Sequence, residues 1–212
     1  MALPIDQIIN CDCMDGMATL DEASIDLIVT DPPYGYSFMG KDWDKAVPSV
    51  DIWKECLRVL KPGSFAFIMS APRLDVLTQM SVRVQDAGFD VAFTPLFWAY
   101  ASGFPKAMNI SKAVDKRLGA EREVVGSYLV SNVTMSQNGG YNNGSARAGE
   151  LKITAPATPQ AKSLNGSYGG FQPKPAVEVI IVAMKPLSEK TYIDQALTNG
   201  KGITWLDDGR IP

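Results

Sequence analysis

The tetrapeptide Asp31-Pro32-Pro33-Tyr34 combines a carboxylate, two rigid residues and an aromatic ring. The prolines fix the backbone and remove two N–H donors, so their carbonyl groups and the Asp31 carboxylate form a cluster of hydrogen-bond acceptors. Such a cluster suits an incoming amino group, and the Tyr34 ring offers a face on which a planar heterocycle can stack. The same residues could instead form an ordinary proline turn at the end of a strand.

The residues before this tetrapeptide favour a functional site. Residues 25–30 form an apolar run that is typical of a buried parallel strand. Ligands of open α/β sheets bind outside the carboxyl ends of strands, which is the position that Asp31 would occupy. The chain has no histidine, so any catalysis would use carboxylates, tyrosine or the orientation of the reactants.

Apolar strand patterns and helical patterns alternate along most of the chain. The alternation predicts an α/β fold with a parallel sheet in three layers. Pro95 interrupts one strand, Ser188 is a candidate N-cap for the last helix, and Gly200 is placed to end that helix. We predict strands over residues 7–11, 25–30, 64–70, 89–100 and 177–184, and helices over residues 14–20, 51–60, 74–87, 109–118 and 189–197.

Two connections stand out. Residues 35–50 exceed a typical connection from strand to helix and include Asp42, Trp43 and Asp44, and we expect them to close over a ligand. Residues 127–174 are rich in Asn, Gly, Ser, Ala and Pro, which predicts irregular structure. Within them, residues 136–145 are expected to be mobile unless a partner orders them.

Composition places the chain among ordinary globular proteins. It has 212 residues, of which 46% are hydrophobic, and this is enough to bury a core in one domain with an inserted module. We find no pattern of a membrane span or a secretory signal and expect a cytoplasmic protein, in a bacterium or a phage-infected host cell. The three cysteines and the absence of histidine predict reduced thiols and no metal site.

The charge is unevenly distributed along the chain. The net charge is -3, but residues 1–100 hold 7 basic and 14 acidic side chains, whereas residues 101–212 hold 13 basic and 9 acidic ones. The basic excess is densest between Lys106 and Lys174, which predicts a surface that faces phosphates. A solvated loop with scattered lysines is the alternative, because no dense basic run is present.

The segment Asp26 to Gly35 resembles the catalytic motif of S-adenosylmethionine-dependent DNA amino-methyltransferases, which methylate adenine N6 or cytosine N4. Residues 10–14 look like the strand-end motif of that family whose aspartate contacts the adenine of the cofactor, which implies this role for Asp12. Residues 57–64, 97–106 and 174–187 are similar to members from phages and prophages.

The resemblance implies a three-layer Rossmann-like methyltransferase fold with a mostly parallel sheet that need not be complete. Residues 1–105 would be the catalytic part, residues 106–175 a partly disordered target-recognition insert, and residues 176–212 the return strand and helix. The implied activity is site-specific methylation of double-stranded DNA, for example in restriction-modification. Aspartate at the first motif position favours adenine N6 over cytosine N4.

The resemblance also implies roles for individual residues. Asp31 and the Pro32 carbonyl would accept hydrogen bonds from the two N–H groups of the target amine. Asp31 would also contact the cofactor near its methyl group. A base swung out of the duplex would stack on Tyr34. Phe97 and Trp98 are candidates for a second wall, with packing in the core as their alternative, and Lys106 and Lys112 are candidates for phosphate contacts.

One feature of that family is missing. Its members carry a Phe-x-Gly-x-Gly-like loop after a later strand to hold the methionine end of the cofactor, and no such motif occurs in this sequence. We therefore expect either a shortened chain or a partner, as a homodimer or a second chain, that completes the cofactor half and pairs the open sheet edges. The alternatives are a non-catalytic DNA-binding or assembly subunit, a truncated remnant, or an RNA or protein methyltransferase.

Overall fold

The chain forms two compact units in a computed structural model that describes residues 6–36, 40, 42–100, 107–130, 149–171 and 176–210. The first unit combines Met1–Tyr100 with Val177–Pro212, and the second comprises Ala101–Ala176. No helix in the described ranges has both the length and the apolar character that crossing a bilayer requires.

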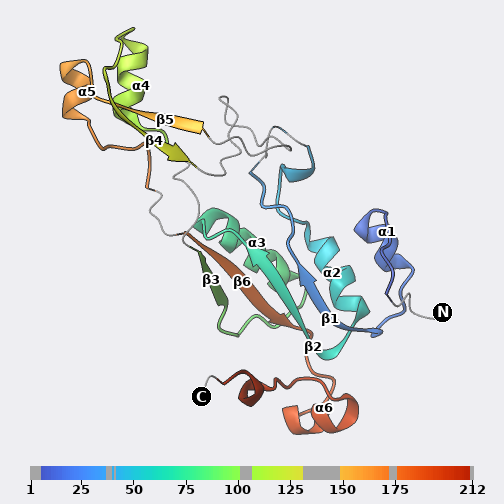
Figure 1. The fold of residues 1–212 in the computed structure, drawn as a ribbon. Coiled ribbons are helices and arrows are strands. Elements are labelled where there is room, and N and C mark those ends of the chain that lie inside the picture. The colour runs from blue at the N-terminus through green and yellow to red at the C-terminus, as the bar shows by residue number, and fades with distance from the viewer. Residues whose placement is uncertain are drawn as a thin grey trace. The chain divides into compact units, whose positions relative to one another are not determined.

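A mixed four-stranded sheet forms the centre of the first unit (Figure 1). Its strands lie in the order β1 (Ile25–Thr30), β2 (Leu60–Ser70), β6 (Ala176–Met184) and β3 (Leu96–Tyr100). β1 runs parallel to β2, whereas β6 is antiparallel to β2. The α/β class is confirmed, but the described sheet is mixed rather than mostly parallel. The reason is that the chain returns from the second unit at the carboxyl end of β2, where Ser70 pairs with Val179, so β6 must run back along β2.

Helices α2 (Val50–Val59) and α3 (Leu74–Asp86) pack on one face of this sheet (Figure 1). The core lies between them and the strands, with Trp53, Ile68 and Met80 at its centre. On the opposite face of β1, Leu27 is 50% exposed and Val29 is 70% exposed. The helices α2 and α3 and the sheet thus supply two of the three predicted layers.

The predicted strand over residues 7–11 is not formed. These residues are irregular, and Ile8 is fully exposed. A strand needs a neighbour for its backbone groups, and among the described residues β1 pairs with β2 alone. The predicted strand over residues 89–100 is shortened to β3, because residues 91–95, which include Pro95, form no ladder.

Helix α1 (Cys13–Ala18) lies against α2, and α6 (Tyr192–Asn199) follows β6. The predicted N-cap of α6 was wrong: the Thr191 hydroxyl accepts the N–H of Asp194, whereas the N–H of Ser188 is held by the buried side chain of Gln195. Gly200 ends α6 in the left-handed conformation, as predicted.

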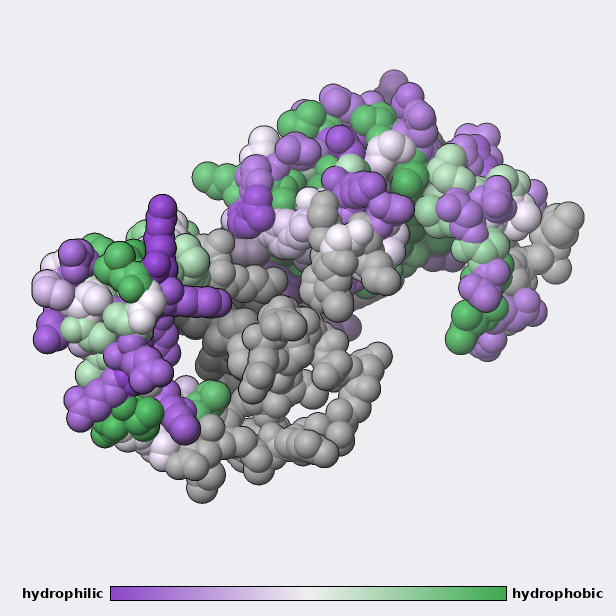
Figure 2. All heavy atoms as spheres, turned by 90° about the horizontal axis from the view of Figure 1, so that it is seen from above, coloured by the Kyte–Doolittle hydropathy of each residue, from purple (hydrophilic) through white to green (hydrophobic). Residues whose placement is uncertain are grey.

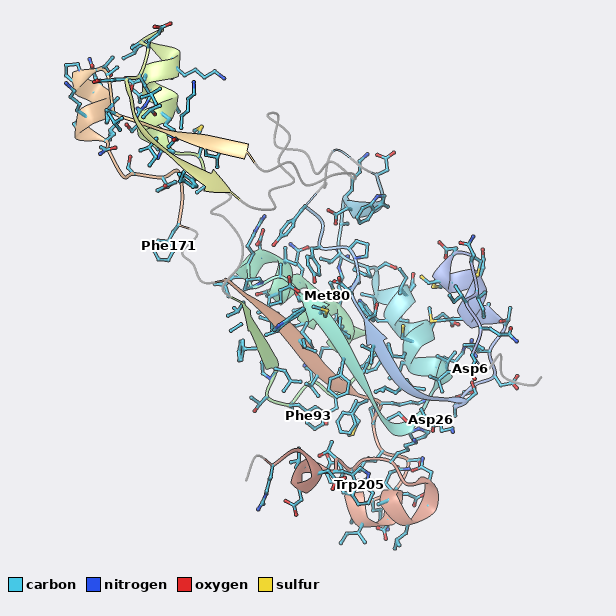
Figure 3. All side chains as sticks on the ribbon, viewed as in Figure 1. Asp6, Asp26, Met80, Phe93, Phe171 and Trp205 are labelled. Atoms are coloured by element: carbon cyan, nitrogen blue, oxygen red, sulfur yellow. The ribbon has the colours of Figure 1, made fainter. Side chains whose placement is uncertain are left out.

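The segment after α6 is attached to the amino end of β1. Asp26 accepts hydrogen bonds from Lys61 at 2.8 Å and from Lys201 at 2.7 Å, and these bonds lower the pKa of its carboxyl group. Figure 3 shows Asp26 at this end of the sheet, with Trp205 in the segment below it. This attachment is at the end of β1 opposite to Asp31.

The second unit contains more regular structure than the sequence predicted. β4 (Val124–Val130) and β5 (Gly149–Thr154) form an antiparallel pair, and α4 (Ile110–Arg117) packs against α5 (Pro159–Ser163). The predicted helix over residues 109–118 is therefore confirmed, with Asn109 as its N-cap. β5 and α5 were not predicted, because the polar composition of residues 127–174 is typical of irregular structure. Residues 136–145, which were expected to be mobile, lie outside the described residues.

A buried carboxylate holds the second unit together. Asp115 on α4 has no exposed surface and accepts hydrogen bonds from Arg122 at 2.6 Å, from the backbone N–H groups of Ala157 and Thr158 at 3.0 Å, and from the Thr158 hydroxyl at 2.7 Å. Burial by itself would raise the pKa of Asp115, but these donors outweigh it and hold the pKa at about 2.

This arrangement predicts an acid-sensitive second unit. Because the pKa of Asp115 is lower in the folded state than its ordinary value of 3.8, its contribution to stability is present above that value and is lost as the pH falls toward about 2. In an acid titration followed by NMR, the dispersed signals of α4 and α5 should weaken over this range. Asp115→Asn should weaken them already at neutral pH, while Glu121→Gln, an exposed change nearby, should leave them unchanged. Equal behaviour of the two variants would contradict this prediction.

Candidate active site

The carboxyl end of β1 brings two residues of the tetrapeptide into contact. Asp31 is exposed, and the half-buried Tyr34 donates a hydrogen bond of 2.6 Å from its hydroxyl to Oδ1 of Asp31. Oδ2 of Asp31 accepts no hydrogen bond from any described residue. The carboxylate therefore lies at the surface and has acceptor capacity left.

The Tyr34 hydroxyl keeps its proton. Burial raises the pKa of Tyr34, and the hydrogen bond to Asp31 and the negative charge of that carboxylate raise it further. At any ordinary pH, Tyr34 is therefore a hydrogen-bond donor to Asp31, and it fixes the direction in which the carboxylate points.

A second carboxylate supports the backbone beneath this pair. Asp44, in the short 3-10 turn η2 (Asp42–Asp44), is only 4% exposed, and its Oδ1 accepts the N–H groups of Tyr34 at 3.0 Å and Gly35 at 2.9 Å. Gly35 has a φ of +75°, and a Cβ there would lie 3.2 Å from backbone atoms of Ala46 and Val47. The described part of the connection 35–50 thus supports the site from inside, a role that the sequence did not reveal.

An aromatic ring and a cation continue the row of side chains away from Asp31. The Tyr36 ring meets the Tyr34 ring edge-on, with centroids 6.0 Å apart. The guanidinium carbon of Arg73 lies 4.6 Å from the centroid of Tyr36, and Nε of Arg73 donates to Asp75 at 3.0 Å. The sequence analysis missed Tyr36 and Arg73, because their proximity depends on the parallel pairing of β1 and β2.

Asp12, Phe97 and Trp98, three other predicted residues of the first unit, belong to other elements than β1 and the turn that follows it. Asp12 is the N-cap of α1 and accepts the N–H of Met14 at 2.8 Å, with its side chain exposed. Phe97 and Trp98 are exposed on β3, which is separated from β1 by β2 and β6. Three strand spacings amount to about 14 Å. The structure therefore does not bring Phe97 and Trp98 next to Tyr34.

The predicted phosphate contacts belong to the second unit. Lys112 is exposed on α4. Lys106 lies outside the described residues. Arg122 belongs to the same basic stretch, but its guanidinium forms an ion pair with Asp115 inside the unit.

The sequence is homologous to a curated methyltransferase. It is 31% identical over 125 residues to the type II methyltransferase M.HpaI of Haemophilus parainfluenzae; the match covers 52% of this chain and 37% of M.HpaI. The chain therefore spans little more than a third of that relative. No protein-family model matches the sequence.

Among solved structures, the chain is similar to TTHA0409 of Thermus thermophilus, which is named as a putative DNA modification methylase. The identity is 18%, with a TM-score of 0.41 and coverage of 95% of this chain and 58% of that one. For the complex of TTHA0409 with S-adenosyl-L-methionine, the TM-score is 0.42 at 18% identity, with 95% and 60% covered.

The support that Asp44 gives to the site can be tested with a pair of neighbouring carboxylates. Asp44→Ala leaves the N–H groups of Tyr34 and Gly35 without their acceptor and should lower the free energy of unfolding by about 1–3 kcal/mol. Asp42→Ala removes only an exposed ion pair with Lys45 and should change it by less than about 0.5 kcal/mol. Urea denaturation measures both, and hydrogen exchange should show faster exchange at Tyr34 and Gly35 in the Asp44 variant alone. Similar losses in the two variants would argue against this role of Asp44.

Proposed function

We propose that this chain carries the catalytic face of a DNA methyltransferase that transfers a methyl group from S-adenosylmethionine to the exocyclic amine of a flipped base, with adenine N6 favoured over cytosine N4. The main support is the exposed Asp31 carboxylate at the carboxyl end of β1, which already accepts a hydrogen bond from a polar donor. Homology to a type II methyltransferase supports the reaction class.

The residues act by orienting the amine. The amine is a poor nucleophile, because its lone pair is delocalised into the base. Hydrogen bonds from its two N–H groups to Asp31 and to the Pro32 carbonyl would draw the nitrogen toward sp³ geometry, and Pro33 would keep the turn rigid. Correct orientation of reactants contributes up to about 7–11 kcal/mol, so Asp31 need not remove a proton.

The residues of this chain fit the reacting end of the cofactor. When bound, S-adenosylmethionine supplies an electrophilic methyl group on a positively charged sulfur, beside which the Asp31 carboxylate is electrostatically favourable. The Asp12 carboxylate retains acceptor capacity beyond its bond to Met14 and would accept from the cofactor's adenine. In this proposal, the loop for the methionine end would come from outside these 212 residues.

The open edge of β1 is where we propose that this further segment pairs. On that side the backbone of β1 meets no other described strand, and Leu27 and Val29 are exposed on the uncovered face. Added strands would satisfy the edge and bury these side chains. They would come from a second copy of the chain, from another chain, or from further residues of a longer protein.

Contacts to double-stranded DNA are assigned to residues 106–175, within the second unit, as a target-recognition module. On α4, Lys112, Lys116 and Arg117 are exposed, whereas the acidic residue of this helix, Asp115, is buried and hydrogen-bonded. The outer face of α4 is therefore purely basic. Figure 2 shows this unit at the left, with hydrophilic side chains over much of its visible face. Phe97 and Trp98, on β3, are not included in this proposal as contacts to a base that stacks on Tyr34, because β2 and β6 separate β3 from β1.

The catalytic role of Asp31 is tested by methyl transfer from labelled S-adenosylmethionine. Asp31→Ala should reduce transfer to double-stranded DNA by about 100-fold or more, because the amine loses an acceptor that orients it. Asp15→Ala, a change at an exposed carboxylate in the first turn of α1, should leave transfer unchanged. Digestion of the product would identify N6-methyladenine or N4-methylcytosine.

Other substrates decide between the alternatives. Transfer to RNA or protein but never to DNA would contradict the proposal. If the wild-type chain, supplied with the segment that completes the cofactor half, bound DNA but neither bound the cofactor nor transferred a methyl group, a non-catalytic DNA-binding or assembly subunit would be the better description.

The basic face of α4 is tested by the salt dependence of DNA affinity. Replacing Lys112 and Lys116 by Gln should reduce the slope of log affinity against log salt by about 0.9 for each phosphate that is no longer neutralised. Lys190→Gln, an exposed change in the first unit, should leave the slope unchanged. Fluorescence anisotropy at several salt concentrations measures these slopes, and an unaltered slope in the double variant would exclude α4 from the interface.

A further inference from the structure

Arg73 lies at the same edge of the sheet as the proposed catalytic residue. It follows the carboxyl end of β2, and β2 runs parallel to β1, which ends directly before Asp31. Its guanidinium carbon is 4.6 Å from the centre of the Tyr36 ring, that ring meets Tyr34, and Tyr34 is hydrogen-bonded to Asp31. A continuous row of side chains thus connects the carboxylate to a cation at the rim of the site.

The guanidinium is held in place and still accessible. Nε and Nη2 of Arg73 pair with the two oxygens of Asp75, while the N–H groups of Nη1 lie outside this pair. The side chain of Arg73 is 52% exposed and that of Asp75 is 55% exposed, so solvent weakens the ion pair. The Tyr36 ring also contacts the guanidinium, whose carbon lies 4.6 Å from the ring centroid, and this contact helps to hold the side chain in place.

We propose that Arg73 binds a phosphate group that flanks the target nucleotide, with Tyr36 as the platform that orients the guanidinium. This inference rests on the proposed function. The sugar links a base to its phosphates, so a base whose amine reaches Asp31 must place its backbone near the rim of the site. The planar fork of an arginine side chain matches the oxygens of a phosphate.

Asp75 provides a test that separates phosphate binding from support of the fold. If Arg73 binds phosphate, Asp75 competes with that phosphate, and removal of its charge should strengthen DNA binding. If instead the pair with Asp75 merely holds the loop of Tyr36 against α3, loss of either partner should have the same effect. The two variants Arg73→Gln and Asp75→Asn therefore give opposite results in the first case and similar results in the second.

The experiment measures the affinity of the full chain for a short duplex that carries one unpaired adenine, since an unpaired base leaves the stack at little cost. Arg73→Gln should weaken binding by about tenfold and reduce the salt slope by about 0.9. Asp75→Asn should tighten binding several-fold, and Arg73→Lys should retain part of the affinity. The loss of affinity caused by Arg73→Gln should be smaller for a duplex of the same sequence in which that adenine is paired. The matched controls are Lys54→Gln and Asp51→Asn, which alter another exposed ion pair. Neither control should change the affinity or the salt slope on either of the two duplexes.

The outcomes distinguish the two proposals. If the wild-type chain binds and methylates DNA and Arg73→Gln keeps the wild-type slope, the role of Arg73 is refuted while the proposed function stands. Parallel weakening by Arg73→Gln and Asp75→Asn without a change of slope would also refute it, in favour of loop support. Loss of S-adenosylmethionine binding in Arg73→Gln with an unchanged DNA slope would assign Arg73 to the cofactor's carboxylate instead. A wild-type chain without any affinity for DNA would overturn both proposals.

Discussion

The hydrogen bonds from the backbone of Tyr34 and Gly35 to the buried carboxylate of Asp44 are the interaction on which the candidate site depends. After two prolines, which have no N–H groups, these are the first amides of the turn, and one oxygen atom fixes both. The fixed backbone then sets where the Tyr34 ring lies, and the Tyr34 hydroxyl sets where the Asp31 carboxylate points. Arg83 on α3 donates to the carbonyl groups of Val47 and Pro48 and so ties the residues after Asp44 to the core.

The chain uses aspartates in two contrasting ways. Asp44 and Asp115 are buried and accept several internal hydrogen bonds, so they hold backbone segments that are distant in the sequence. Asp31 is exposed, accepts one hydrogen bond from the described residues and keeps one oxygen atom available. The first arrangement stabilises the fold, because leaving a buried charge without partners is costly. The second is suited to an external donor.

The sequence predicted the parts of the fold that depend on local patterns. The strand before Asp31, the helices α3 and α4 and the glycine that ends α6 follow from apolar spacing and capping residues within a few positions of each other. The support from Asp44 and the stacking of Arg73 on Tyr36 could not be predicted, because tertiary contacts bring those groups together. The direction of β6 depends on where the chain returns from the second unit, and β5 and α5 lie in a polar region whose composition resembles that of a loop.

The hydrogen bond between Tyr34 and Asp31 bears on how one base would be chosen over another. Because the Tyr34 hydroxyl occupies one oxygen atom of Asp31, the proposed target amine would find its acceptor there in the other oxygen atom. Stacking on Tyr34 would be open to any base. Discrimination would arise from repulsion. Thymine presents a carbonyl oxygen where adenine or cytosine presents an amino group, and a carbonyl oxygen that faces the Asp31 carboxylate is repelled and forms no hydrogen bond with it.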